Sequence, residues 1–254
     1  MNPLIRTHLL EIRYELLKAL RLPAYSLPTL LFPVVFYLLF GVMLGAKSVG
    51  PVQMSEYLLA TYGAFGVIGA ALFGFGVSVA VERGQGWLEV KRTSPMPISA
   101  YFVAKLAMAM TFSVAIVILL FTTGILMGGA TISLGNAAAL MGILVTGSLT
   151  FCALGLALGF LTGPNSAAPI ANLIYLPMGF LSGLWIPLRF LPDTVKDIAL
   201  WLPPYHFSEL ALGAIGASSG EPVLWHVGAL VVATILFLTI AWVGYRRDEG
   251  KTYG

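Results

Sequence analysis

E-R-G-Q-G-W-L-E-V-K-R-T-S-P-M-P, residues 82–97, is a charged island between two long apolar runs of this sequence. Five charges fall within its first eleven residues: Glu82, Arg83, Glu89, Lys91 and Arg92. After Lys105 the chain has no Asp, Glu, Lys or Arg until Arg189. Because so polar a stretch is costly in hydrocarbon, we expect it to lie in water at one face of a membrane.

The local sequence of the island predicts a short amphipathic helix followed by a stop. Trp87, Leu88 and Val90 are expected to form its apolar face, with the charges opposite. The Ser94-Pro95-Met96-Pro97 run should end the helix, because proline has no amide donor and disfavours helix at the preceding residue. The alternative interpretation is a plain solvated loop between two membrane spans.

Composition places the whole chain in a membrane. Of its 254 residues, 58% are hydrophobic and only 10% charged, whereas soluble domains carry about 25% charged residues. Apolar runs of about 20 residues match spanning helices rather than barrel strands, so we expect an all-α integral membrane protein. The single Cys152 excludes an internal disulfide and a cysteine-built metal site. A net charge of +3 without a long basic tract argues against nucleic-acid binding.

Residues 1–22 are expected to form an amphipathic helix that lies in the membrane interface. Its apolar positions recur at helical spacing, namely Ile5, Leu9, Ile12, Leu16 and Leu20. Charged residues occupy much of the remainder, as in helices that lie in the interface plane. The alternative is a simple charged tail. Because charges occur throughout this segment, we expect no cleavable signal peptide.

Residues 23–254 are expected to form a single domain of six membrane spans. The predicted spans are 24–45, 57–81, 102–127, 137–161, 167–188 and 223–245. Glycine pairs that allow close helix packing include Gly155/Gly159. With the N-terminus in the cytoplasm, eleven of the fourteen Lys and Arg residues lie inside, leaving Lys47, Arg189 and Lys196 outside. This bias predicts cytoplasmic termini and a cytoplasmic 82–97 segment.

The outer segment 189–221 is expected to contain two short helices between spans 5 and 6. Thr194 and Asp197 have the spacing of a capping box. Pro203-Pro204 interrupts the pattern before a second apolar stretch, 206–215. This arrangement predicts a re-entrant or interfacial cap, and an ordinary structured loop is the alternative.

The sequence shows no site that would use ATP or an ion gradient to drive transport. Gly250-Lys251-Thr252 resembles the end of a phosphate-binding loop, but Tyr245 occupies the position of the first glycine. The centres of the six predicted spans lack Asp, Glu, Lys and Arg, which ion-driven carriers normally keep at membrane depth. We therefore expect any transport to be driven by a partner that contacts the cytoplasmic face.

An intramembrane enzyme is also disfavoured by the sequence. Ser148 and His226 are conceivable as a nucleophile and its base, but no local pattern supports the pair. His226 lies at the outer start of the last span and is interpreted as an interfacial residue. We expect no catalytic residue and no metal site in this chain.

At this point the sequence resembles a known family, the membrane permease subunits of bacterial type-2 ATP-binding-cassette (ABC) exporters. The resemblance rests on Glu82-Arg83-Gly84, Leu88-Glu89-Val90 and Thr93-Ser94-Pro95, which are similar to the family's E-R-x-x-G-T-L-E-x-L-x-x-[ST]-P stretch. The amphipathic N-terminal helix, the six spans and the segment from Gly183 to Tyr205 agree with it. Trp87 departs from the pattern, because the family usually has threonine there.

The resemblance implies a transport subunit of the bacterial cytoplasmic (inner) membrane that has no cofactor. Two six-span units, identical or paralogous, would form the pathway above two ATPase subunits that bind ATP and Mg²⁺. Residues 82–97 would couple to the ATPase, through Glu82, Arg83, Gly84, Trp87, Leu88, Glu89, Arg92 and Pro95. Spans 2 and 5 would line the pathway, where Phe65, Phe73, Asn172, Tyr175 and Met178 are candidates.

The cargo implied is hydrophobic or amphipathic: a drug, a lipid or a lipid-linked molecule leaving the cytoplasm or the inner leaflet. A pathway without charges agrees with such a cargo. Two alternatives remain at this stage, a self-powered secondary transporter and a membrane scaffold that transports nothing.

Overall fold

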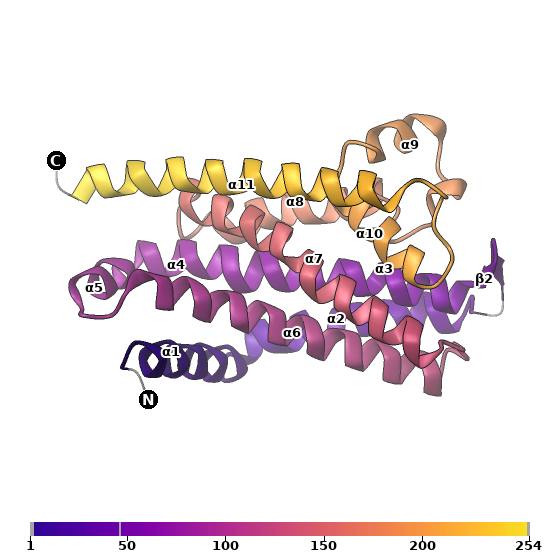
Figure 1. Cartoon of the computed structure of the whole chain (residues 1–254), viewed down its shortest axis with the longest axis horizontal. Coiled ribbons are helices and arrows are strands. Elements are labelled where there is room, and N and C mark those ends of the chain that lie inside the picture. Colours follow the sequence, from indigo (N-terminus) through magenta and orange to yellow (C-terminus); the bar gives the residue numbers. More distant parts are fainter. Residues whose placement is uncertain (1–2, 46, 253–254) are drawn as a thin grey trace.

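The computed structural model describes residues 3–45 and 47–252, apart from the side chains of Pro3, Arg92 and residues 249–252. The described chain is an elongated bundle of helices (Figure 1). The N-terminal helix α1 (Pro3–Leu20), the short helix α5 (Trp87–Thr93) and both chain ends lie at one end of the bundle. A hairpin of β1 (Ser48–Val49) and β2 (Val52–Gln53) lies at the other end with α9 (Asp193–Ala199).

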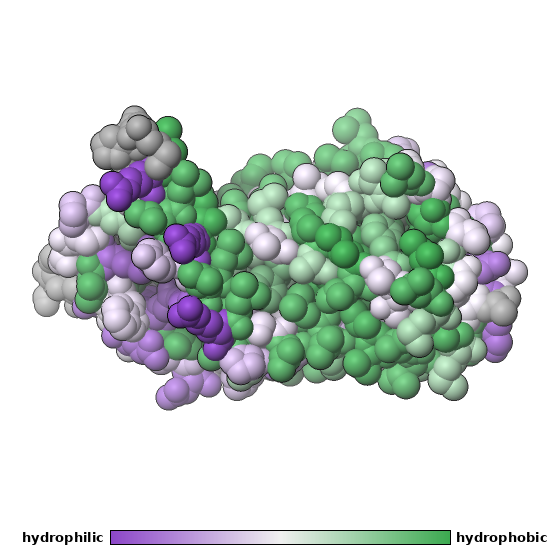
Figure 2. Space-filling view, turned by 90° about the horizontal axis from the view of Figure 1, so that it is seen from below, coloured by the Kyte–Doolittle hydropathy of each residue, from purple (hydrophilic) through white to green (hydrophobic). Residues whose placement is uncertain are grey.

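Within the described residues, five helical segments are long and apolar enough to cross a membrane. They comprise α2 (Pro23–Phe36) with η1 (Tyr37–Val42); α3 (Met54–Gly69) with η2 (Ala70–Val77) and α4 (Ser78–Gly84); α6 (Ile98–Leu126); α7 (Leu134–Leu161); and α11 (Val223–Thr252). Figure 2 shows a broad apolar belt flanked by polar ends. The chain is therefore a multi-pass, all-α membrane protein, as the composition predicted.

The predicted fifth span is shorter than expected. Helix α8 (Ala167–Leu181) has 15 residues and ends where Gly183 takes a φ of +76°. A helix of that length rises about 22 Å, less than the hydrocarbon thickness of about 30 Å. The six-span topology and the cytoplasmic placement of the termini therefore stay predictions.

Helix α3 forms the centre of the bundle, because nearly all of its side chains are buried. Its continuation η2 approaches α7 closely enough to require glycine on both sides. A Cβ atom added at Gly76 would lie 2.5 Å from the carbonyl oxygen of Gly155. Gly159, one turn beyond Gly155, contacts the same stretch through the carbonyl oxygen of Gly76. The glycine pair noted in the sequence thus forms a backbone-to-backbone contact.

The outer segment contains the 3₁₀ turn η3 (Leu188–Phe190), α9 and α10 (Pro203–Ala214). The capping box predicted at Thr194 is wrong, because α9 begins one residue earlier, at Asp193, after Pro192. Lys196 instead donates to Asp193 at 2.8 Å. Helix α10 packs against α3, α7 and α11 with Phe207 fully buried, so this segment is integrated into the bundle. Whether it is re-entrant stays a prediction.

Two histidines join α10 to α11. His206 Nε2 donates to the carbonyl oxygen of Leu200 at 3.0 Å, so in the neutral ring His206 Nδ1 accepts from His226 Nδ1, also at 3.0 Å. Both rings are buried among protein side chains, and the membrane-interface position expected for His226 stays a prediction. Burial lowers the pKa of His206, and the neighbouring His226 acts in the same direction, although the Leu200 carbonyl opposes the shift.

We expect Gly76→Ala to destabilise the protein by about 1–3 kcal/mol, because the new methyl would overlap backbone atoms that cannot move aside cheaply. Gly142→Ala is the matched control, since a Cβ at Gly142 meets no atom within 4 Å. Unfolding midpoints of the two purified variants in the same detergent check this. Equal midpoints would show that η2 and α7 are not in backbone contact.

We expect the unfolding midpoint to fall as the pH drops below about 6.5, the ordinary histidine pKa. The folded protein holds a proton on His206 less tightly than the unfolded chain does, so acid favours unfolding. His206→Gln should flatten this dependence between pH 7.5 and 5. His8→Gln, at the other end of the bundle, is the control and should keep it. An unchanged slope in His206→Gln would contradict the assignment.

Candidate functional site

The most unusual feature at the α1 end of the bundle is a fully buried ammonium. Lys105 lies on α6 with its side chain 0% exposed. Its Nζ donates to Glu15 at 2.5 Å, to Glu82 at 2.7 Å and to the Ser78 hydroxyl at 2.9 Å. Glu15 comes from α1, whereas Ser78 and Glu82 come from α4. One lysine therefore joins three helices that are distant in the sequence.

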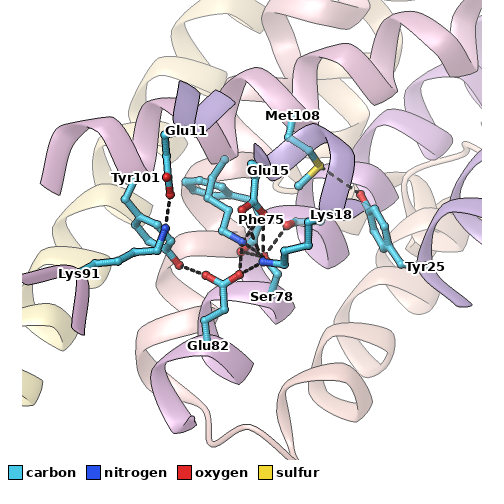
Figure 3. A network of polar contacts seen from close by, with 12 residues as sticks. Glu11, Glu15, Lys18, Tyr25, Phe75, Ser78, Glu82, Lys91, Tyr101 and Met108 are labelled. Atoms are coloured by element: carbon cyan, nitrogen blue, oxygen red, sulfur yellow. Dashed lines mark hydrogen bonds and ion pairs between the residues drawn. The ribbon is translucent and has the colours of Figure 1, made fainter. Parts of the chain in front are cut away.

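Glu82 makes the other central contacts of this cluster (Figure 3). We call the cluster the charged junction and define it as Glu15, Lys18, Ser78, Glu82, Tyr101 and Lys105. Glu82 accepts hydrogen bonds from Lys105, from Lys18 and, at 2.7 Å, from the Tyr101 hydroxyl. The two carboxylates and two ammonium groups of the junction give it no net charge. Such a cluster is stable because each desolvated charge is paired and hydrogen-bonded.

Lys18 is the most exposed member of the junction, with its side chain 51% exposed. Burial lowers its pKa, but the carboxylates of Glu82 and Glu15 outweigh that effect and raise the pKa above its ordinary value. Lys18 therefore carries its charge at neutral pH.

A second ion pair links α1 to α5. Lys91 on α5 pairs with Glu11 on α1, and its ammonium lies 4.9 Å from the centre of the Tyr101 ring. On the other side, Arg83 donates to the carbonyl oxygens of Phe160 and Thr162 at 3.1 and 2.6 Å. Arg83 also pairs with Asp248 of α11 at 3.0 Å. The turn between α4 and α5 is thus held from both sides.

Helix α5 begins after Gly86, which has a φ of +76°. The prediction that Trp87, Leu88 and Val90 form one apolar face is wrong. Leu88 is buried in a small cluster with Tyr101, whereas Trp87 and Val90 are 54% and 59% exposed. Residues three apart share a side of a helix, so Leu88 and Lys91 face the bundle while Trp87 and Val90 face away.

The remaining predicted coupling residues divide between the interior and the surface. Glu82 and Arg83 make the internal contacts above, and Gly84 packs closely on Pro164. Glu89 and Pro95 are exposed. The side chain of Arg92 lies outside the described residues. The exposed part of the segment is therefore centred on Trp87, Glu89 and Val90, while Glu82 and Arg83 fix its position.

A cavity of about 510 Å³ lies beside the charged junction, between α1, α2, η2, α4 and α8. Among the predicted pathway residues, Phe73, Asn172 and Tyr175 line it. Phe65 does not, because it is fully buried and stacks on the Tyr175 ring with centroids 4.3 Å apart. Met178 packs against the core and is also not part of the wall.

Glu15, Lys18 and Lys105 were not predicted as site residues from the sequence. The signal was present, because Lys105 falls inside the predicted span 102–127 and is its only charged residue. A lysine at that depth needs a carboxylate partner. Glu89 and Glu82, both predicted at the same membrane face, were the nearest candidates along the sequence.

Comparison with known proteins places these features in context. The family model described as ABC-2 type transporter matches residues 9–215, which is most of the chain. YvfS of Bacillus subtilis (strain 168), a candidate transport permease by its name, is 26% identical over 235 residues, covering 92% of this chain and 95% of YvfS. The inner membrane transport permease YhhJ of Escherichia coli (strain K12) is 26% identical over 189 residues. That match covers 69% of this chain but only 47% of YhhJ.

We expect Lys105→Met to lower the free energy of unfolding by about 3–5 kcal/mol, because Glu15 and Glu82 would be left with Lys18 alone. Lys196→Met, which removes an exposed pair with Asp193, should cost less than about 1 kcal/mol. Adding Glu82→Gln to Lys105→Met should recover part of the loss by restoring the balance of charge. Chemical unfolding in detergent micelles measures all three. A double variant no more stable than Lys105→Met would argue against the ion cluster.

Proposed function

The chain belongs to the ABC-2 type transporter family, and we propose that it is the membrane permease of an exporter driven by a separate ATPase. Family membership and the similarity to transport permeases establish a transport permease subunit in a membrane. The ATPase partner, the direction and the cargo are our proposals.

The observation that carries the proposal is the exposed face of α5. Trp87, Glu89 and Val90 protrude at the end of the bundle that holds both chain ends, while Leu88 and the Lys91–Glu11 pair fix the helix beneath them. An exposed tryptophan beside an acidic residue, on a rigid support, has the composition of a binding hot spot. This face suits a soluble ATPase docked beneath the membrane.

The charged junction would transmit the motion of the ATPase. A displacement of α5 acts on α1 through Lys91–Glu11, and on α4 through the turn that Arg83 holds. Lys105 couples α1 and α4 to α6. Because these contacts are ionic and partly or fully shielded from water, the four helices would move together rather than slide. ATP and Mg²⁺ bind to the partner, so this chain needs no cofactor.

We further propose that two ATPase subunits serve two permease chains, this chain and a second copy or a paralogue. Small apolar and aromatic walls suit a hydrophobic or amphipathic cargo, exported across a bacterial cytoplasmic membrane. Phe73, Asn172 and Tyr175 are the pathway residues that the cavity supports. An even number of spans places both termini on the same side of the membrane. The proposed six-span arrangement therefore depends on α8 completing a crossing.

The test is co-expression with a candidate ABC ATPase from the same genome and purification through a tag on the permease. Trp87→Ala and Glu89→Arg should each raise the Kd for the ATPase about thirtyfold, as expected for the loss of a hot-spot residue worth about 2 kcal/mol. Stimulated ATP hydrolysis should fall in parallel. Trp201→Ala is the matched control, because Trp201 is 87% exposed in the outer segment.

Normal ATPase binding by both variants would overturn the assignment of α5. If no ATPase co-purifies with the wild-type chain, a self-powered carrier or a scaffold becomes the better interpretation. Unfolding midpoints of the variants, measured alongside, separate lost docking from lost folding.

A further inference from the structure

The cavity beside the charged junction has two chemically different ends. Glu15, Lys18, Ser78 and Glu82 line one end, and Phe32, Pro33, Tyr175 and Leu176 line the other. Helix α2 runs along the wall from Leu22 to Pro33, about 16 Å at 1.5 Å per residue. The cavity is therefore an amphipathic slot rather than a uniformly apolar void.

The slot communicates with the apolar surface of the protein. Leu22 and Phe32 line it and are themselves 52% and 39% exposed. Their neighbours on α2, Leu27 and Leu31, are large apolar side chains that are about half exposed. An apolar helix face of this kind contacts lipid in a membrane, so a lipid chain could enter the slot along α2.

Charge at the mouth favours an anionic head. Among the charged side chains that line the slot, Glu15 and Glu82 are only 7% and 11% exposed, and each is already paired with an ammonium. Lys18 is half exposed and charged, and it already donates to Glu15 and Glu82, so a headgroup phosphate would approach the exposed side of its ammonium. The exposed Arg13 and Arg21 lie on or directly after the same helix, α1. An approaching headgroup therefore meets positive charge first.

We propose that this slot binds an acidic membrane phospholipid, with its phosphate at Lys18 Nζ and one acyl chain along α2 toward Tyr175. A headgroup with a net negative charge is attracted by the exposed side of Lys18 and by the nearby Arg13 and Arg21. A zwitterionic headgroup gains less, because its own cation offsets its phosphate, and a cationic amphiphile is repelled. The slot is the cavity to which the proposed pathway is assigned, but lipid binding needs only the membrane placement of the chain, so its test does not depend on the ATPase partner. Bound lipid would touch the junction that joins α1, α4 and α6.

The probe is phosphatidylglycerol carrying a photoreactive diazirine on one acyl chain, diluted into phosphatidylcholine nanodiscs that hold the full chain. Crosslinks should map to α2 and α8. Unlabelled phosphatidylglycerol should compete about fivefold better than phosphatidylcholine, as expected for one basic residue near the membrane surface. Equal competition by phosphatidylglycerol and phosphatidylcholine would overturn the proposal.

Two pairs of variants test the two ends of the slot. Lys18→Gln should abolish the fivefold preference, whereas Arg21→Gln, whose residue is exposed and not part of the lining, should keep most of it. Val77→Trp should fill the slot and remove the α2 and α8 crosslinks, while Val231→Trp, on the exposed face of α11, should not.

Ala24→Leu is a milder filling variant at the wall, in case Val77→Trp does not fold. Displacement of the probe by inorganic phosphate alone would overturn the proposal, because it would reduce the site to an anion site at Lys18. Equal crosslinking in Lys18→Gln and wild type, at equal unfolding midpoints, would do the same.

Discussion

The buried ammonium of Lys105 constrains everything at the α1 end of this protein. A lysine that is removed from water must be paired, and the two carboxylates that pair with it come from α1 and α4. Helix α1, which would otherwise lie free in the interface, is therefore fixed against α6 and α4. Glu82 in turn holds Lys18 and Tyr101, so the position of α5 beyond it is set by the same charges.

A different constraint governs the middle of the bundle, where few polar groups are available. There η2 and α7 approach until Gly76 and Gly155 touch through their backbones, and α3 is enclosed on nearly all sides. Without a hydrophobic driving force between helices in lipid, such close packing is what holds membrane helices together. The two ends are then tied by polar contacts, Lys105 at one end and the His206–His226 pair at the other.

These two constraints explain why the candidate functions gather at one end. The rigid middle supports a polar end whose parts are joined by ion pairs, and the exposed face of α5 and the slot along α2 both border the charged junction. A force on α5 and a lipid at Lys18 would act on the same cluster of charges. The junction is thus the place where a partner beneath the membrane and the membrane itself could influence the helices together.

Composition and apolar length by themselves determined the membrane class, the approximate bounds of the long helices and the polar character of residues 82–97. These properties depend on transfer from water to lipid, which a sequence reports residue by residue. Tertiary structure alone decided that Leu88 faces inward while Trp87 and Val90 face out, that Lys105 joins Glu15 and Glu82, and that His226 meets His206. Those facts depend on which distant segments share a contact, and the rotation of a short helix after Gly86 is fixed only by the neighbours against which it packs.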